Sequence, residues 1–167
     1  MTSPSFAPRR ATLVDVPAIA RVINRAYVVE RFFKDGDRTS EEDVRVLMSR
    51  PHVVFLVVDD GASPSELAGS VHVEVKGTRG YFGMLSVDPK RQGSGLARLL
   101  IEAAEEHCRV RGCTFMDISV VNLRTDLPAF YAKFGYAPYG TAPLAGHEPL
   151  TRKAHLVLMT KPLVPLW

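Results

Sequence analysis

Cysteine is scarce in this sequence, with Cys108 and Cys113 as the only two among 167 residues. Four residues separate them, and no further cysteine completes a metal-binding or disulfide framework. We therefore expect two reduced thiols packed in the interior and no resident metal ion.

Long apolar runs and an excess of one charge are also missing. The longest purely apolar stretch, residues 53–58, is far shorter than the roughly 20 residues that cross a bilayer. Lys and Arg total 21 against 18 Asp and Glu, and the basic residues are scattered, which disfavours a nucleic-acid partner. A secretory signal has an apolar core after a positively charged start, and the first ten residues hold no such core. We expect a cytoplasmic protein, monomer or homodimer, that binds neither membranes nor nucleic acids.

The composition and the continuity of the sequence indicate one folded domain. Hydrophobic residues make up 46% of the chain, which is the globular average, and no internal repeat or linker divides it. We expect a single domain over residues 1–167, with a core from about 7 to 162.

Strand and helix signals alternate through this domain, which indicates an α/β or α+β fold. Strand patterns cover residues 6–10, 53–59, 67–76, 81–87, 114–121, 136–141 and 153–161. Helical patterns cover residues 15–27, 39–48, 96–110 and 125–134. Asp15 is expected to cap the first helix, and Ser40 followed by Asp43 resembles a capping box at the second. Apolar and polar residues alternate strictly over 67–76, so we expect the face bearing Ser70, His72 and Glu74 to be wet.

The most informative stretch joins the strand at 81–87 to the helix at 96–110. It contains the run Gln92-Gly93-Ser94-Gly95-Leu96-Ala97. Gly93 and Gly95 would let the backbone approach a ligand closely, and the unpaired N–H groups of a first helical turn favour an anion. A pyrophosphate suits such a turn, and so does a plain tight connection between a strand and a helix.

Two commoner phosphate-binding loops match poorly. The nucleoside-triphosphate P-loop needs Gly-Lys-Ser/Thr where this chain has Gly95, Leu96 and Ala97. A dinucleotide-binding fold needs a third small residue where Arg98 stands and an acidic residue at the end of the next strand, whereas Asp117 is in mid-strand. The antiparallel strands before the turn do not suit a doubly wound sheet either.

The same run resembles, position by position, the Gln/Arg-x-x-Gly-x-Gly/Ala signature of the GNAT (GCN5-related N-acetyltransferase) superfamily. Val87, Asp88 and Pro89 before it look like the strand ending of that family. Asn122 after the next strand and the run 130–136 look like the family's Asn and its Tyr-bearing helix that ends in Gly-Phe/Tyr. With the order of elements, the resemblance covers residues 7–162.

This resemblance implies a mixed, mostly antiparallel sheet of six to seven strands with about four helices, splayed between the fourth and fifth strands. Acetyl-coenzyme A would lie in the opening, its pantetheine arm paired with the backbone at Leu85 and Val87. The amides of residues 93–97 would hold the pyrophosphate, and Gln92 would orient the turn. Asn122 and Tyr131 are further implied cofactor contacts.

Acyl transfer from a thioester to an amine needs a neutral amine, a polarised carbonyl and an acid for the departing thiolate. Tyr131 matches the position where many family members have this acid, and a phenol placed beside the sulfur could protonate it. An aromatic side chain packed at a helix edge is the alternative interpretation. A backbone amide near Leu85 would polarise the carbonyl.

A general base is harder to assign, because the strand at 81–87 lacks the carboxylate that some family members have there. Glu74 and His72 share the polar face of the neighbouring strand, and His155 lies in the last strand pattern, so each could act through water. A solvated strand face and a structural histidine explain these residues as well. The pair His72-x-Glu74 also suggests a deaminase zinc site, but the required Pro-Cys-x-x-Cys is absent.

For the acceptor, the resemblance points to the segment at 28–38, with Glu30, Phe32, Phe33 and Arg38 as candidate contacts. An ordinary surface loop explains its charges equally well.

Two hypotheses for the function remain. One is an N-acetyltransferase that transfers the acetyl group of acetyl-coenzyme A to a primary amine of a small molecule, peptide or protein in a ternary complex. The other is a non-catalytic acyl-coenzyme A-binding module.

Overall fold

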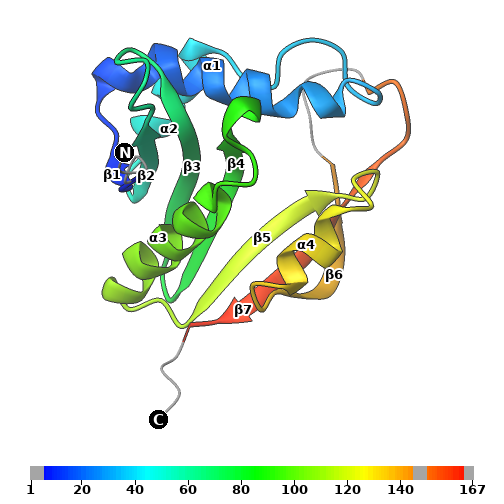
Figure 1. The fold of residues 1–167 in the computed structure, drawn as a ribbon. Helices are drawn as coiled ribbons and strands as arrows, with labels where there is room; N and C mark the ends of the chain where they lie inside the picture. Colours follow the sequence, from blue (N-terminus) through cyan, green and yellow to red (C-terminus); the bar gives the residue numbers. More distant parts are fainter. Residues whose placement is uncertain (1–5, 145–149, 164–167) are drawn as a thin grey trace.

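The computed structural model describes residues 6–144 and 150–163, which form one seven-stranded sheet with helices on both faces (Figure 1). The strand order is β1-β2-β3-β4-β5-β7-β6, and neighbours are antiparallel except for β4 and β5, which are parallel. The strands are β1 (Arg9–Arg10), β2 (Val53–Asp59), β3 (Leu67–Lys76), β4 (Arg79–Val87), β5 (Phe115–Val121), β6 (Ala137–Pro143) and β7 (His155–Pro162). The helices are α1 (Val16–Ala26), α2 (Glu41–Met48), α3 (Leu96–Val110) and α4 (Leu127–Ala132), with short 3-10 turns η1 (Leu13–Asp15), η2 (Tyr27–Glu30) and η3 (Pro89–Arg91). The predicted mixed, mostly antiparallel sheet is thus confirmed.

Two hydrophobic cores lie on the two faces of the sheet. Successive side chains of a strand point to opposite faces, so an apolar strand in the middle of the sheet can supply both cores. In β2, Val54 and Leu56 pack on the face covered by α3 and α4, whereas Phe55 and Val57 pack on the face covered by α1 and α2. This arrangement explains why β2 reads as an uninterrupted apolar run.

The prediction that the polar face of β3 is exposed to solvent is wrong. Ser70 is fully buried and His72 is only 6% exposed, because α1 packs across this face of the sheet. The His72 ring lies between the rings of Phe55 and Tyr81, at centroid distances of 5.5 and 5.9 Å. Solvent reaches this face only toward the end of the strand, where Glu74 is partly exposed. Alternation of polar and apolar residues could not reveal a helix packed on the polar side.

The ends of the elements depart from the sequence patterns in ways that local hydrogen bonds explain. Asp15 is at the N-cap position of α1, as predicted, but its side chain makes no capping hydrogen bond to that helix. Its carboxylate accepts from the backbone N–H of Thr12 at 2.8 Å and pairs with Arg9 at 2.8 Å, which closes the preceding turn η1 instead. The predicted cap of α2 is confirmed, since Ser40 Oγ accepts from the N–H of Asp43 at 3.1 Å.

The seam between β4 and β5 is the feature of the fold that positions the site. The two strands pair only at three positions, Arg79–Phe115, Gly80–Met116 and Tyr81–Asp117. Beyond these pairs the strands diverge, and Figure 1 shows them together at the lower end and apart near α1. The predicted splay between the fourth and fifth strands is therefore confirmed.

Both cysteine thiols are free and buried, as expected. Burial raises the pKa of Cys108 to about 12, so this thiol stays protonated at neutral pH. Within the described ranges, no helix combines the length and the apolar character needed to span a bilayer.

Candidate active site

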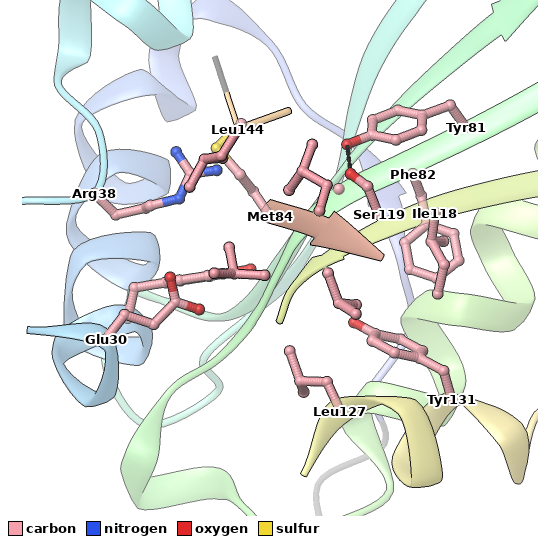
Figure 2. Close-up of a pocket in the computed structure, with 15 residues that line it drawn as sticks. Glu30, Arg38, Tyr81, Phe82, Met84, Ile118, Ser119, Leu127, Tyr131 and Leu144 are labelled. Carbon is pink, nitrogen blue, oxygen red and sulfur yellow. Dashed lines mark hydrogen bonds between the residues drawn. The ribbon is translucent and has the colours of Figure 1, made fainter. Parts of the chain in front are cut away.

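A pocket opens between β4 and β5 beyond the last of their three pairs. Its walls come from both diverging strands, from η2 and the segment after it, and from α4 (Figure 2). Polar groups in the lining belong to Tyr27, Glu30, Arg38, Tyr81, Ser119 and Tyr131. The remaining lining is apolar and includes Phe82, Met84, Ile118, Val120, Leu127 and Leu144. A pocket in which polar groups converge between apolar side chains is a usual form of a site for a small ligand.

Tyr131, the expected general acid, lies in this pocket. It is 8% exposed and is held by the rings of Phe82, Phe130 and Tyr136, at centroid distances of 6.0, 5.0 and 6.2 Å. Its hydroxyl points toward the pocket in Figure 2, and within the described part of the chain it has no hydrogen-bond partner. Burial raises the pKa of Tyr131, so the hydroxyl retains its proton at neutral pH. The packed ring fits the interpretation of Tyr131 as a packed aromatic side chain, and the unpaired hydroxyl fits its interpretation as a general acid.

Glu30 also lies in the pocket, on η2 at the end of α1. It is 7% exposed, and its Oε2 accepts from Arg124 Nη1 at 2.9 Å. Burial raises the pKa of Glu30, while Arg124 opposes that shift. None of the described residues donates a hydrogen bond to the other carboxylate oxygen, which leaves that oxygen available to a ligand.

Of the three other predicted acceptor contacts, one lines the pocket and two do not. Arg38 lines the pocket. Phe33 is 1% exposed and Phe32 is 45% exposed, and neither belongs to the pocket lining. Their backbone carbonyls instead accept hydrogen bonds from Thr151, which joins this segment to the chain before β7.

None of the three base candidates lines the pocket. His72 lies behind Tyr81, and burial lowers its pKa to about 4, so it is neutral at pH 7. Glu74 lies 3.9 Å from Lys76 near the far end of β3. His155 is exposed at the start of β7. The structure therefore does not bring these residues together with Tyr131.

The glycine turn follows β4 and leads into α3. Gly93 and Gly95 have φ of +82° and +83°, and no atom lies within 4 Å of where a Cβ would stand at either. Residues 92–95 are exposed, and Ser94 Oγ donates to the carbonyl of Arg91 within the turn. The N–H groups of the first turn of α3, including those of Leu96 and Ala97, have no intrahelical partner. Backbone donors that face open space next to a helix dipole suit a phosphate group.

A β-bulge interrupts β4 opposite Val71, where Met84 and Leu85 occupy the place of one residue. Met84 has φ of +49°, and Ser86 Oγ donates to its carbonyl at 2.9 Å. Within the described chain, no strand pairs with the β5-facing edge of β4 over residues 82–87. Leu85 and Val87 lie on this stretch, so their backbone edge is available to an extended ligand.

Asn122, an expected cofactor contact, joins β5 to β7. Its Oδ1 accepts from the N–H of His155 at 2.8 Å, and its own N–H donates to the carbonyl of His155 at 2.9 Å. The side-chain oxygen is therefore already used by the protein.

Sequence reasoning missed Tyr27, Tyr81, Ser119 and Arg124. Tyr27 ends a helical pattern, and Tyr81 and Ser119 belong to strand patterns, with no special signal at any of the three. Arg124 could have been found, since it is two residues after the Asn of the family motif. In residues 6–144 and 150–163, no group of three or more His, Cys, Asp or Glu side chains could hold a metal ion.

The fold and the pocket define an acyltransferase-like architecture, a sheet opened at a parallel seam next to a glycine turn. The acetyltransferase (GNAT) family model matches residues 17–136, well over half of the chain, and the chain belongs to this family. Members of the family use acetyl-coenzyme A as acyl donor.

Individual relatives are more distant. The chain is 32% identical over 90 residues to glucosamine 6-phosphate N-acetyltransferase 1 of Oryza sativa subsp. japonica, a match that covers 51% of this chain and 53% of that protein. It is 30% identical over 136 residues to mycothiol acetyltransferase of Saccharopolyspora erythraea, covering 78% of this chain and 43% of that protein. The matches thus span about half the length of these relatives. The ribosomal-protein-S18-alanine N-acetyltransferase of Escherichia coli has the same fold, with a TM-score of 0.77, 17% identity, and coverage of 98% and 97% of the two chains.

Proposed function

We propose that this protein transfers the acetyl group of acetyl-coenzyme A to a primary amine of a small molecule or of a peptide or protein, by direct attack in a ternary complex. The observation that carries the proposal is the position of the Tyr131 hydroxyl, which is unengaged and faces a pocket at the open end of the β4–β5 seam. When bound, acetyl-coenzyme A would supply an acyl thioester, which is the electrophile of the reaction.

The residues present fit this cofactor. The exposed turn at residues 92–97 would hold the pyrophosphate through backbone N–H groups, which need the close approach that Gly93 and Gly95 permit. The unpaired edge of β4 at Leu85 and Val87 would bind the amide-bearing pantetheine arm by strand-like hydrogen bonds. The bulge leaves one residue outside the ladder, so a backbone N–H near Leu85 can act as a preformed donor to a carbonyl.

Proton transfer would use side chains that line the pocket. Tyr131 keeps its proton at neutral pH and would donate it to the departing sulfur. Glu30 is the one carboxylate in the described lining, and its free oxygen would accept a proton from the amine. Burial raises the pKa of Glu30, which strengthens it as a base. His72, Glu74 and His155 lie outside the lining, so any part they take would be through intervening water.

Two measurements on the purified protein test the proposal. Calorimetry should show binding of acetyl-coenzyme A, and a thiol-release assay across a panel of primary amines should show turnover. Initial rates that vary both substrates should give intersecting reciprocal plots, as a ternary complex requires. Absence of cofactor binding would refute the assignment, whereas binding without turnover of any amine would identify the alternative, a non-catalytic acyl-coenzyme A-binding module.

A further inference from the structure

Two charged side chains, Glu30 and Arg38, belong to the described lining of the pocket. Glu30 supplies the one negative group in the described lining, and Arg124 already pairs with it at 2.9 Å. Arg38 is the one arginine in the described lining, whereas Arg124 lies outside the lining and also pairs with Asp126 at 3.1 Å. Both arginines favour the ionised form of Glu30 against the effect of its burial. The charge of Glu30 is thus already engaged by Arg124, whereas Arg38 forms no ion pair with any described residue.

Among the described residues, Arg38 differs from comparable arginines in having no acidic ion-pair partner. Arg25 and Arg91, which are also partly buried, form ion pairs with Asp88 at 3.0 Å and with Asp60 at 2.6 Å. The guanidinium of Arg38 lies over the ring of Tyr27, 5.5 Å from its centroid, and hydrogen-bonds to no residue in the described ranges. An aromatic face orients a guanidinium without using its N–H donors. Arg38 is thus a positioned cation with its hydrogen-bonding capacity still open to the pocket.

We propose that Arg38 binds an anionic group on the acceptor, so that the substrate class is amines that also carry a carboxylate or a phosphate. This inference rests on the proposed function, because it assigns the second substrate of the same site. Figure 2 shows Arg38 and Glu30 side by side on one wall of the pocket, with Tyr131 on the other. The anionic group lies against Arg38, and the amine lies toward the free oxygen of Glu30.

This charge arrangement also disfavours some amines. A polyamine or a lysine-rich peptide would bring further positive charge next to Arg38, which forms no ion pair with any described residue. A planar guanidinium with free donors instead matches the paired oxygens of a carboxylate or phosphate.

Matched pairs of acceptors test the inference by turnover. L-phenylalanine is compared with L-phenylalaninamide, and phosphoethanolamine with ethanolamine, at saturating acetyl-coenzyme A. The anionic member of at least one pair should show the higher kcat/KM, by about 10-fold to 100-fold, the range for charge-assisted hydrogen bonds. The amine of the amide has the lower pKa and is more often neutral, so a preference for the acid reports binding rather than nucleophile supply. The pair that responds distinguishes carboxylate from phosphate.

Arg38→Gln should remove this preference: the ratio of kcat/KM for the anionic acceptor to kcat/KM for its neutral partner should fall about 10-fold or more. Arg38→Lys should restore part of the preference, since it keeps the charge and loses the fork of donors. Arg31→Gln is the matched control, because Arg31 is exposed on the same segment, faces Asp37 at 3.6 Å and does not line the pocket. It should behave as wild type.

Equilibrium binding gives a readout that does not need turnover. Calorimetric titration of L-phenylalanine and of phosphoethanolamine into the protein saturated with coenzyme A should show affinity that falls in Arg38→Gln and not in Arg31→Gln. Turnover of amines with no preference for the anionic member of either pair, or an unchanged preference in Arg38→Gln, would overturn the inference while leaving the acetyltransferase proposal standing. Failure to bind coenzyme A at all would overturn the proposed function itself.

Discussion

The two ends of the β4–β5 seam are built from the same two strands and have opposite properties. At the closed end, residues 79–81 and 115–117 pair through the backbone, and Arg79 donates two hydrogen bonds of 2.7 Å to Asp117. At the open end, the strands separate around the pocket, and the contact that spans them is a long one of 3.4 Å between Tyr81 Oη and Ser119 Oγ. The closed end therefore provides rigidity, and the open end provides unpaired backbone.

The difference shows how a fold can hold a binding edge open. An unpaired strand edge in the middle of a sheet normally closes by pairing with its neighbour. Here α3 packs on β3 and β4, while α4 lies over the other half of the sheet, so each strand is held by its own half. The closed end fixes the angle between the halves.

The largest expected effect comes from opening the closed end. A Cβ added at Gly80 would stand 2.5 Å from Cys108 Sγ and 3.1 Å from Met116 Sδ. Gly80→Ala should therefore lower the free energy of unfolding by about 3 kcal/mol, because the buried Cys108 has little room to shift. Urea denaturation measures the change. Gly140→Ala in β6 is the control, since its Cβ would meet no atom within 4 Å, and equal losses in both variants would contradict this account.

At the open end, the removal of one oxygen should affect turnover and not folding. Tyr131→Phe should lower kcat on the order of 10²-fold, the usual contribution of a general acid, and should leave acetyl-coenzyme A affinity nearly unchanged. Thiol release and calorimetry measure the two quantities. Tyr139→Phe is the control, because Tyr139 is 56% exposed and outside the pocket lining. Turnover of Tyr131→Phe within a few-fold of wild type would show that Tyr131 only packs.

A smaller effect is expected in the turn that follows the open end. Gly95→Val should weaken acetyl-coenzyme A binding by about 10-fold or more, because a branched side chain at φ of +83° strains the turn and blocks close approach of a phosphate. Gly112→Val is a matched control at the other end of α3, with φ of +88° and open space around it. Both variants should lose similar stability in thermal unfolding, and only Gly95→Val should lose affinity. Unchanged affinity in folded Gly95→Val would remove the pyrophosphate from this turn.

The smallest effect is expected for the ion pair at the closed end. Arg79→Ala should lower the free energy of unfolding by less than about 1 kcal/mol, because the Arg79 side chain is 46% exposed and water screens the pair. The loss should shrink further at high salt. Arg98→Ala, which removes an exposed pair with Glu102 on α3, provides a comparison. If Arg79→Ala destabilises the protein as much as Gly80→Ala, electrostatics and not packing hold the seam closed.

The glycine turn and Tyr131 could be found from the sequence because each belongs to a compact motif. The proposed general base could not. The sequence directed attention to His72 and Glu74 on β3, whereas the carboxylate in the described pocket lining is Glu30. Glu30 and Tyr131 line the same pocket because η2 and α4 both border the open seam. Arg124 pairs with Glu30 across 94 positions of sequence, a separation that no local pattern encodes.

The sequence by itself determined the order of strands and helices, the apolar faces, the cap at Ser40 and the glycine turn, because each depends on neighbours within a few residues. The tertiary structure alone decided that the polar face of β3 is covered by α1, and that β4 and β5 separate after three pairs. It also decided that Glu30 and Arg38 line the resulting pocket whereas Phe32 and Phe33 do not. These features depend on which surfaces compete for burial once the chain is compact. Periodicity records the side of a strand on which a residue lies, and only packing sets what covers that side.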